Sequence, residues 1–533
     1  MSAIKYIYKI IICGVERRKM KGFNLIKPIS KIYFLLFFLN SLYLISAFKK
    51  FNDNEVFLSL FLILLFLFFI GNKSSKLNKT TFLILSVLDI FAIIEFITKR
   101  LSGFYFHDVP NEIISIVYDT NISEIKSNIY FSSKEVNGFI LLFLNLLFVF
   151  KLRCVKRKND LLVSFFMVLF VFMFFVFSNN PINAAVKSIV NNRDVIKENI
   201  NAIKNRKNFV WGAIPEEDEK QTMVLFLGET HRGDYLSING YSKQTTPLLE
   251  KENIISFKNA ISQAAYTLQS TPMILSRKDV NDKGIFREKS LISAFKEAGF
   301  ETWYVSYLPP ALYGDNEINL IANEADHYVK SNVNNKTLKE ILSNNSHKKL
   351  IVYKTIGSHY LYHERYPNEY NIFKPSFKND TYNTPSFSDK EKLENDYANS
   401  IVFSVDKQVS DFIKILKKES GLVSLSFISD HGTSIYDDGE SLYGGNTKGN
   451  YNIALFFWFN DVYNRLYPND IETLINNRNK KVSGKYFLDT MLDIGKVSSK
   501  VRKGFSLLET DLKEKNRYIK NRNIYDYDRD IKN

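Results

Sequence analysis

Cysteine is nearly absent from this 533-residue chain, which contains only two. Both of them, Cys13 and Cys154, lie in the first third, near the ends of apolar stretches. Residues 155–533 can therefore form no disulfide and offer no thiolate nucleophile. The chain also lacks an internal repeat, and its start lacks the pattern of a cleavable signal peptide.

Acidic residues are fewer than basic ones, with 56 Asp and Glu against 71 Lys and Arg, so the formal charge is +15. Such a surplus can indicate nucleic-acid binding, but here much of it lies beside apolar stretches. We therefore expect anionic lipid headgroups, and not nucleic acid, as the partner of these charges. A hydrophobic share of 45%, with 45 Phe, also points to membrane segments.

Five apolar stretches follow one another in the N-terminal part of the chain. They have 15 to 19 residues each, close to the roughly 20 that a bilayer requires. The stretches are Ile32–Phe48, Val56–Gly71, Thr80–Thr98, Val136–Phe150 and Leu161–Phe177. This pattern predicts a transmembrane domain of five helices over residues 32–178.

The distribution of Lys and Arg predicts how these spans are oriented. Residues 1–31, expected to form an interfacial helix, carry eight basic residues and one acid, and loops 72–79 and 151–160 are also basic. Loops 49–55 and 99–135 carry at least as many acids as bases. The positive-inside rule then places the N-terminus in the cytoplasm and everything after the fifth span outside the inner membrane.

The remainder of the chain reads as a bridging helix over residues 179–215, an α/β domain over 216–509 and a charged, loosely ordered tail over 510–533. Strands and helices alternate in the α/β domain, which predicts a mostly parallel central sheet covered by helices on both faces. The expected strands are Met223–Leu227, Thr302–Tyr307, Leu350–Ile356, Leu422–Ser429 and Ile453–Phe459, and the clearest helices are Lys289–Ala298 and Asn399–Lys417.

Two of the expected strands end in side chains that can bind a metal. Glu229 follows the first strand, and Asp430 and His431 follow the fourth. Carboxyl ends of parallel strands meet at one edge of a sheet, where α/β proteins place their sites. A carboxylate such as Glu229 is more often a helix cap, but adjacent Asp and His before a glycine are less often structural. We therefore predict that the three residues converge on Zn²⁺ or a similar ion.

Two further residues are candidates for chemistry at such a metal. Thr267 could act as a nucleophile, since a metal lowers the pKa of a hydroxyl, although most threonines are structural. His359 follows the third strand and could orient a phosphate or act as a general acid.

Taken together, the motifs of this chain resemble those of bacterial phosphoethanolamine transferases, a family of the alkaline-phosphatase/sulfatase-like superfamily. The resemblance covers residues 30 to 500 and rests on short motifs in a common order. These are Gly228-Glu-Thr-His-Arg232, Asn239-Gly-Tyr241, Thr245-Thr-Pro247, Tyr266-Thr267, Ile356-Gly-Ser-His359, Arg365-Tyr-Pro367, Tyr397-Ala-Asn-Ser400 and Ser429-Asp-His-Gly432. That family joins five transmembrane helices to a periplasmic catalytic domain.

The resemblance implies a ping-pong transfer of phosphoethanolamine from phosphatidylethanolamine through a covalent intermediate on Thr267. It implies one or two zinc ions, bound by Glu229, Thr267, Asp430 and His431. It also implies that His359 contacts the phosphoethanolamine group. The substrate-binding residues carried over are His359, Tyr443, Arg232 and Asn399.

The chain departs from the lipid A-modifying branch of that family in three places. Tyr443 stands where that branch has a second substrate-contacting histidine, and Gln263 and Met273 stand where cysteines flank the nucleophile loop. Thr433 replaces a frequent acid. We therefore expect the acceptor to be a sugar of the lipopolysaccharide core or O-antigen in preference to lipid A. The alternatives are a glycerol-phosphate transferase of the lipoteichoic acid synthase kind and a non-catalytic sulfatase-like membrane protein.

Overall fold

The structure is a computed structural model that describes residues 200–307, 317–380, 385–443, 446–501, 504–521 and 523–531. These residues belong to one compact unit of the chain. The interfacial segment, the five predicted spans and most of the bridge lie outside them. Residues 200–207, at the end of the predicted bridge, are helical. Within the described ranges, no helix is both long and apolar enough to cross a membrane.

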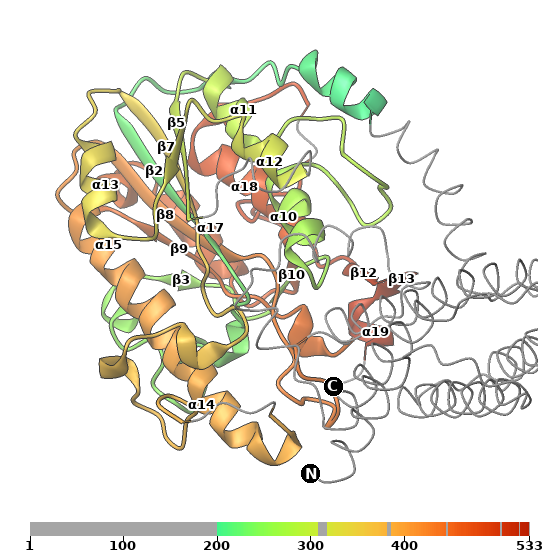
Figure 1. Cartoon of the computed structure of the whole chain (residues 1–533). Helices are drawn as coiled ribbons and strands as arrows, with labels where there is room; N and C mark the ends of the chain where they lie inside the picture. Colours follow the sequence, from blue (N-terminus) through green and yellow to red (C-terminus); the bar gives the residue numbers. More distant parts are fainter. Residues whose placement is uncertain are drawn as a thin grey trace, which may run out of the picture. The chain divides into compact units, whose positions relative to one another are not determined.

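A seven-stranded sheet forms the centre of the described domain, in the order β3-β9-β8-β2-β7-β5-β6 (Figure 1). The strands β8, β2, β7, β5 and β6 are parallel, while β9 and β3 pair antiparallel at one side. Their bounds are β2 (Gln221–Gly228), β3 (Ile255–Ser256), β5 (Glu301–Ser306), β6 (His327–Lys330), β7 (Lys348–Lys354), β8 (Leu422–Ser429) and β9 (Leu455–Phe459). The predicted mostly parallel sheet is confirmed, with all five expected strands in it.

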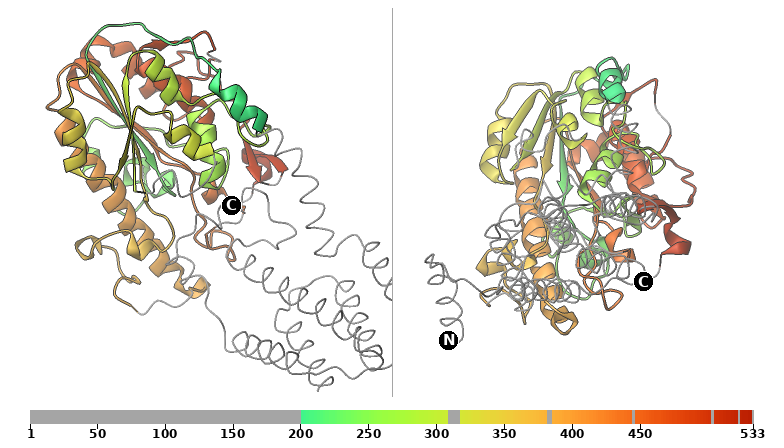
Figure 2. Two further views of the ribbon diagram at one scale, coloured as in Figure 1. Left: turned by 45° about the horizontal axis from the view of Figure 1, so that its top comes forward. Right: turned by 45° about the vertical axis from the view of Figure 1, so that its right-hand side comes forward.

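Helices cover both faces of this sheet because its strands are apolar on both sides. Met223, Leu225 and Leu227 of β2 pack into one core, and Val224 and Phe226 pack into the other. The first core is covered by α10 (Thr267–Leu275), α11 (Leu291–Glu297), α12 (Glu317–Ala322), α16 (Asp461–Leu466), α17 (Pro468–Asn477) and α18 (Phe487–Ile494). The second is covered by α13 (Asn335–Leu342), α14 (Lys390–Ile401) and α15 (Gln408–Leu416) (Figure 2).

The long helix predicted over residues 399–417 begins earlier, at Lys390. It runs through α14, a π-helical stretch η9 (Val402–Lys407) and α15. It is preceded directly by the 3-10 helix η8 (Phe387–Asp389), which a capping box between Ser386 and Asp389 begins. The first turns are mostly charged, so apolar periodicity alone did not reveal them.

The prediction of a loosely ordered C-terminal tail was wrong. Residues 518–521 and 523–530 form β12 (Tyr518–Asn521), β13 (Asn523–Asp526) and α19 (Tyr527–Asp530), and β12 pairs antiparallel with β13. Three apolar side chains among the charged ones, Ile519, Tyr527 and Ile531, are buried and anchor this segment. Two short pairs complete the described strands, β1 (Ile214–Pro215) with β11 (Val497–Ser498) and β4 (Ala260–Ile261) with β10 (Val482–Ser483).

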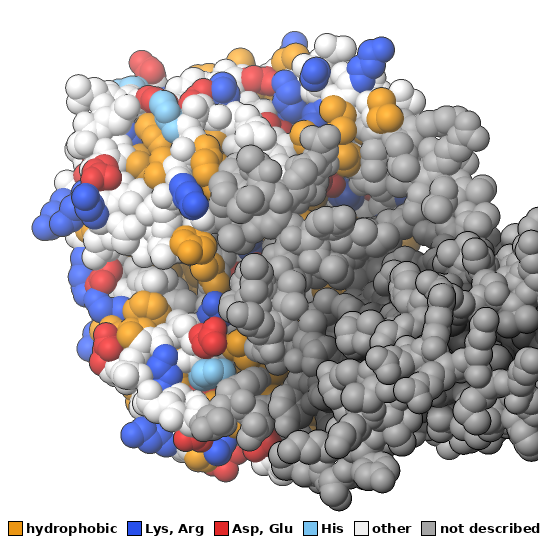
Figure 3. Space-filling view, viewed as in Figure 1, with side chains coloured by type: hydrophobic (Ala, Val, Ile, Leu, Met, Phe, Trp, Pro, Cys, Tyr) orange, Lys and Arg blue, Asp and Glu red, His pale blue; other side chains and the backbone are white. Residues whose placement is uncertain are grey.

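The described surface mixes both signs of charge. On the face shown in Figure 3, Lys and Arg side chains are interspersed with Asp and Glu over most of the described area. Pairs such as Lys407 with Asp411 and Lys417 with Glu252 contribute to this mixing. The described part of this face therefore does not show the single-sign basic patch that nucleic-acid binding favours.

Candidate functional site

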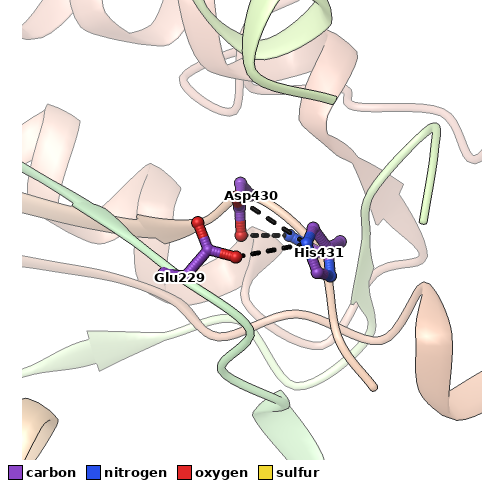
Figure 4. Close-up of side chains that lie close together, drawn as sticks. All are labelled: Glu229, Asp430 and His431. Atoms are coloured by element: carbon purple, nitrogen blue, oxygen red, sulfur yellow. Dashed lines mark hydrogen bonds and ion pairs between the residues drawn. The ribbon is translucent and has the colours of Figure 1, made fainter. Parts of the chain in front are cut away.

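The pairing of the parallel strands brings the predicted ligands together. Gly228 of β2 is in register with Ser429 of β8, so the next residues, Glu229 and Asp430, leave neighbouring strands at the same edge. His431 follows, and the three side chains point toward one another (Figure 4). Their ligand atoms all lie within 4.8 Å of one another, and all three residues are buried. His431 Nε2 lies 3.3 Å from Glu229 Oε1 and 3.9 Å from Asp430 Oδ2.

Hydrogen bonds outside the cluster orient Asp430 and His431 for metal binding. Asp430 Oδ1 accepts the backbone N–H groups of Thr230 at 3.1 Å and of His431 at 2.7 Å, which leaves Oδ2 facing the cluster. His431 Nδ1 lies 2.6 Å from the Gly432 carbonyl oxygen. Donation from Nδ1–H to that oxygen leaves the Nε2 lone pair directed at the cluster. Two carboxylates and one imidazole nitrogen in this arrangement fit a divalent metal ion.

A lysine that the sequence reasoning missed completes the cluster. Lys354, the last residue of β7, places Nζ 2.5 Å from Glu229 Oε2 and 3.0 Å from Asp430 Oδ2. The strand β7 lies beside β2, with Lys354 in register with Leu227. The available signal was a charged residue within an otherwise apolar predicted strand, which buried strands rarely contain without a partner.

Burial and these charges set the protonation of the cluster. Burial alone would raise the pKa of Glu229, but Lys354 and His431 beside it hold that pKa well below its usual value. Burial, with the neighbouring Glu229 charge, raises the pKa of Asp430. Burial lowers the pKa of His431, but Asp430 and Glu229 outweigh it and raise this pKa to about 9. The facing cations thus favour the charged form of Glu229, whereas burial and the Glu229 charge oppose the charged form of Asp430.

Thr267 lies directly beside the predicted metal ligands. Its Oγ1 is 3.0 and 3.1 Å from the two carboxylate oxygens of Glu229 and 3.2 Å from His431 Nε2. It is the first residue of α10, so its hydroxyl lies at the positive end of that helix. Negative charge that develops on or near this oxygen is favoured there.

The loop after β2 is held in an unusual conformation. Thr230 has φ 64°, in the left-handed region that a β-branched residue rarely adopts. Tyr397 of α14 fixes it: the hydroxyl donates to the Thr230 carbonyl oxygen at 2.6 Å and accepts the Arg232 N–H at 2.7 Å. Strain of this kind persists only where the surroundings enforce it, and it is common at functional sites.

The loop after β7 is tied to the same place. The Ser358 N–H donates to the Glu229 carbonyl oxygen at 3.0 Å. Gly357 has φ 50°, and a Cβ there would collide with that oxygen and with the His231 ring. The Ser400 hydroxyl donates to Ser358 Oγ at 2.7 Å. The loops that carry Glu229 and His359 are therefore fixed to each other.

His359 and Tyr443, both predicted to contact substrate, lie together. The Tyr443 hydroxyl is 2.8 Å from His359 Nε2, and the rings of Tyr443 and Tyr360 stack with centroids 5.4 Å apart. Tyr443 is 40% exposed, so this pair is open to solvent.

The side chains of Arg232 and Asn399 form ion pairs and hydrogen bonds with other residues of the protein. The Arg232 guanidinium is buried and pairs with Asp234 and Asp437, each at 2.7 Å. The fully buried Asn399 accepts the N–H groups of Ile372 and Phe373 and donates to the Phe373 carbonyl oxygen. The structure gives both side chains a role in holding loops, and their contact with substrate stays a prediction.

The described chain is similar to known proteins that transfer phosphoethanolamine. Phosphoethanolamine transferase EptC of Escherichia coli K12 is 24% identical over 344 residues, which are 58% of this chain and 58% of that protein. The chain thus matches little more than half the length of this curated relative.

Two solved structures share the fold. One is the C-terminal periplasmic domain of the Escherichia coli EptC protein in complex with Zn, with a TM-score of 0.53 and 22% identity, over 60% of this chain and 96% of that one. The other is the integral membrane protein lipooligosaccharide phosphoethanolamine transferase A from Neisseria meningitidis. It has a TM-score of 0.60 and 19% identity, over 90% of this chain and 98% of that one.

A family model provides the broadest assignment. The model described as Sulfatase matches residues 221–497, more than half of the chain. This range contains the sheet, Thr267 and all the predicted metal ligands. The chain therefore belongs to the sulfatase family, and the predicted resemblance to phosphoethanolamine transferases is confirmed.

Proposed function

We propose that this chain transfers phosphoethanolamine from phosphatidylethanolamine to an envelope glycolipid, through a covalent intermediate on Thr267. One observation supports this most: the Thr267 hydroxyl lies 3.0 to 3.2 Å from Glu229 and His431, within a buried cluster suited to a metal. A structural threonine has no need of a carboxylate and a histidine around its hydroxyl. The names of the similar proteins support the same substrate group.

The residues Glu229, Asp430 and His431 would hold zinc, with Thr267 as a further ligand. Zinc, when bound, supplies a Lewis acid that lowers the pKa of the Thr267 hydroxyl and neutralises charge on the phosphoryl group. The donor set of oxygens and one imidazole nitrogen suits this ion. The Zn complex of the similar Escherichia coli domain supports the choice of metal.

In the first step, Thr267 Oγ1 attacks the phosphorus of phosphatidylethanolamine. A bond forms between that oxygen and phosphorus, and the bond from phosphorus to the diacylglycerol oxygen breaks. The hydroxyl proton passes to solvent, because Glu229, 3.0 Å away, would be a metal ligand and its lowered pKa makes it a weak base. Lys354 and the N-terminus of α10 stabilise the negative charge that develops on the phosphoryl oxygens.

His359 would protonate the leaving diacylglycerol oxygen as a general acid. Tyr443 holds its Nε2 through the 2.8 Å contact and so keeps the ring at the open side of the site. In the second step, the acceptor hydroxyl oxygen bonds to phosphorus and its proton passes to His359. The bond from phosphorus to Thr267 Oγ1 breaks, and Thr267 regains its proton from solvent. One site thereby serves a lipid donor and a sugar acceptor in turn.

We place the protein in the bacterial inner membrane, with the five predicted spans in the bilayer and the catalytic domain in the periplasm. Membrane lipids then surround the spans, and phosphatidylethanolamine is available as donor. The fold shared with an integral membrane protein over 90% of this chain supports this arrangement. Because Gln263, Met273 and Tyr443 depart from the lipid A-modifying pattern, we favour a core or O-antigen sugar as acceptor.

Mass spectrometry of lipid A, core and O-antigen fractions tests the proposal. We would compare cells that express wild type, Thr267→Ala, or Thr473→Ala, a control in which an exposed hydroxyl on α17 is removed. A phosphoethanolamine increment in one fraction, lost only in Thr267→Ala, is expected and names the acceptor.

Intact-protein mass distinguishes the alternatives. A phosphoethanolamine adduct on Thr267 supports the proposal, whereas a glycerol-phosphate adduct would assign the chain to the lipoteichoic acid synthase kind. No increment in any fraction and no adduct on purified, zinc-loaded protein would leave a non-catalytic role.

A further inference from the structure

We propose that the C-terminal segment formed by β12, β13 and α19 positions the nucleophile, by holding the backbone that leads into α10. This inference rests on the proposed role of Thr267 as nucleophile. The segment follows the last predicted sheet strand by about 60 residues in sequence, yet it contacts residues 259–266.

Backbone pairing makes the first contact. The Lys520 N–H donates to the Gln263 carbonyl oxygen at 2.8 Å, and Lys520 forms a parallel bridge with Ala264. The Lys520 ammonium also donates to the Asp282 carbonyl oxygen at 2.8 Å. The strand β12 thus extends along the nucleophile loop three residues before Thr267.

Apolar packing makes the second contact. Ile519, Tyr527 and Ile531 form a small buried core with Ile261 and Ala265, and each of these side chains is less than 9% exposed. The partly buried Tyr266 and Tyr525 pack against the same core. Burying a large apolar side chain contributes about 1.5–3 kcal/mol, so this core is enough to hold a short segment.

An ion pair fixes the ends of the segment to the same loop. Arg517 pairs with Asp528 through two hydrogen bonds of 2.6 and 2.9 Å. A third nitrogen of the same guanidinium, Nη1, donates to the Asn259 carbonyl oxygen at 2.6 Å. The C-terminal segment and the adjoining Arg517 are therefore hydrogen-bonded to the loop at two points, Asn259 and Gln263.

The position of Thr267 depends on this loop. Tyr266 precedes α10 in an extended conformation, so any shift of residues 263–266 moves the first residue of the helix. Thr267 has to stay 3.0 to 3.2 Å from Glu229 and His431. A misplacement of about 1 Å can lower a rate about 10²-fold. Because residues 155–533 contain no cysteine, no disulfide can restrain this loop, and noncovalent contacts have to do so.

Two neighbouring residues of β12 offer a matched test. Ile519 is fully buried in the small core, whereas Tyr518, on the opposite face, is 47% exposed. In the full-length, zinc-loaded protein we would measure the rate of adduct formation on Thr267, the KM for phosphatidylethanolamine, zinc content and hydrogen exchange of residues 263–275. We expect Ile519→Ala to exchange faster in that peptide and to lower the rate at least tenfold, with KM and zinc content within twofold of wild type. Tyr518→Ala is expected to match wild type in all four.

Unchanged hydrogen exchange, or faster exchange with an unchanged rate, would overturn the positioning role. Loss of zinc together with the rate would also overturn it, since it would show general loss of structure. A second variant, which ends at Lys515, distinguishes loss of the segment from misfolding of the domain. If the domain is intact, adding a peptide of residues 516–533 should restore the rate. If wild type itself forms no adduct, the proposed function fails and this inference falls with it.

Discussion

Lys354 and Glu229 form a buried ion pair across two neighbouring parallel strands, with Nζ 2.5 Å from Oε2. The same Nζ lies 3.0 Å from Asp430 Oδ2, so one ammonium group faces both carboxylates of the cluster. Two buried carboxylates this close repel each other strongly unless a cation lies between them. Lys354 therefore keeps the two ligands together independently of a metal.

We predict that Lys354→Met destabilises the zinc-free protein by about 3–5 kcal/mol, the usual cost of leaving a buried charge without its partner. Zinc should restore most of this loss, since a divalent cation between the carboxylates replaces the missing charge. Urea denaturation of both proteins, with zinc and with a chelator, measures the effect. Lys336→Met, which removes an exposed pair with Glu340, is the control and should cost less than about 1 kcal/mol. Equal losses with and without zinc would contradict the prediction.

Removal of a single ligand should abolish metal binding without unfolding the domain. Asp430→Asn keeps an oxygen that can accept the N–H groups of Thr230 and His431, but it loses the charge that faces the cluster. We expect zinc content to fall at least tenfold and adduct formation on Thr267 to become undetectable. Elemental analysis of the purified protein gives the first value and intact mass the second. Asp461→Asn, at an exposed helix start, should retain both.

Much of the site could be predicted from sequence because it lies at strand ends. The run Leu422–Ser429 was predicted with its observed bounds, since its apolar residues, interrupted only by small serines, form a short run that ends at the turn residues Asp430 to Gly432. The parallel pairing of β2 with β8 then made the meeting of Glu229 and Asp430 a consequence of register. Thr267 and His359 were candidates on residue type and became specific only through the resemblance to a family.

What the sequence did not reveal depends on contacts between distant segments. Lys354 was read as part of a strand because its two carboxylate partners lie 125 and 76 residues away. The C-terminal strands were missed because their few apolar residues, Ile519 and Tyr527 among them, are irregularly spaced between charged and Asn residues. β3 and β6 have only two and four residues, too few for a periodic pattern. The motif around Tyr397 and Ser400 gave no hint that its hydroxyl groups hold two loops of the site.

The buried His231 should make the protein less stable in mild acid. Burial lowers the pKa of its ring to about 3, so the ring stays neutral in the folded protein. In the unfolded chain the same ring binds a proton near pH 6.5, so the unfolded state binds more protons between pH 6.5 and 3. The free energy of unfolding should therefore decrease as the pH is lowered through this window. At pH 5 the loss relative to neutral pH should be about 2 kcal/mol. His231→Gln should lose less of its free energy of unfolding between pH 7.5 and pH 5 than wild type, as measured by urea denaturation of the zinc-free proteins. Equal losses in the two proteins would refute this account.

Tyr443 should act on the rate through His359 and leave donor affinity unchanged. Its hydroxyl lies 2.8 Å from Nε2, and its ring stacks on Tyr360, so Tyr443→Phe removes the polar contact and keeps the packing. We expect a decrease in kcat of about tenfold, within the range that a positioned general acid contributes, with KM for phosphatidylethanolamine within twofold. Tyr436→Phe is the control, since that hydroxyl donates to the Pro385 carbonyl oxygen, away from His359. A change in KM alone would instead assign Tyr443 to substrate binding.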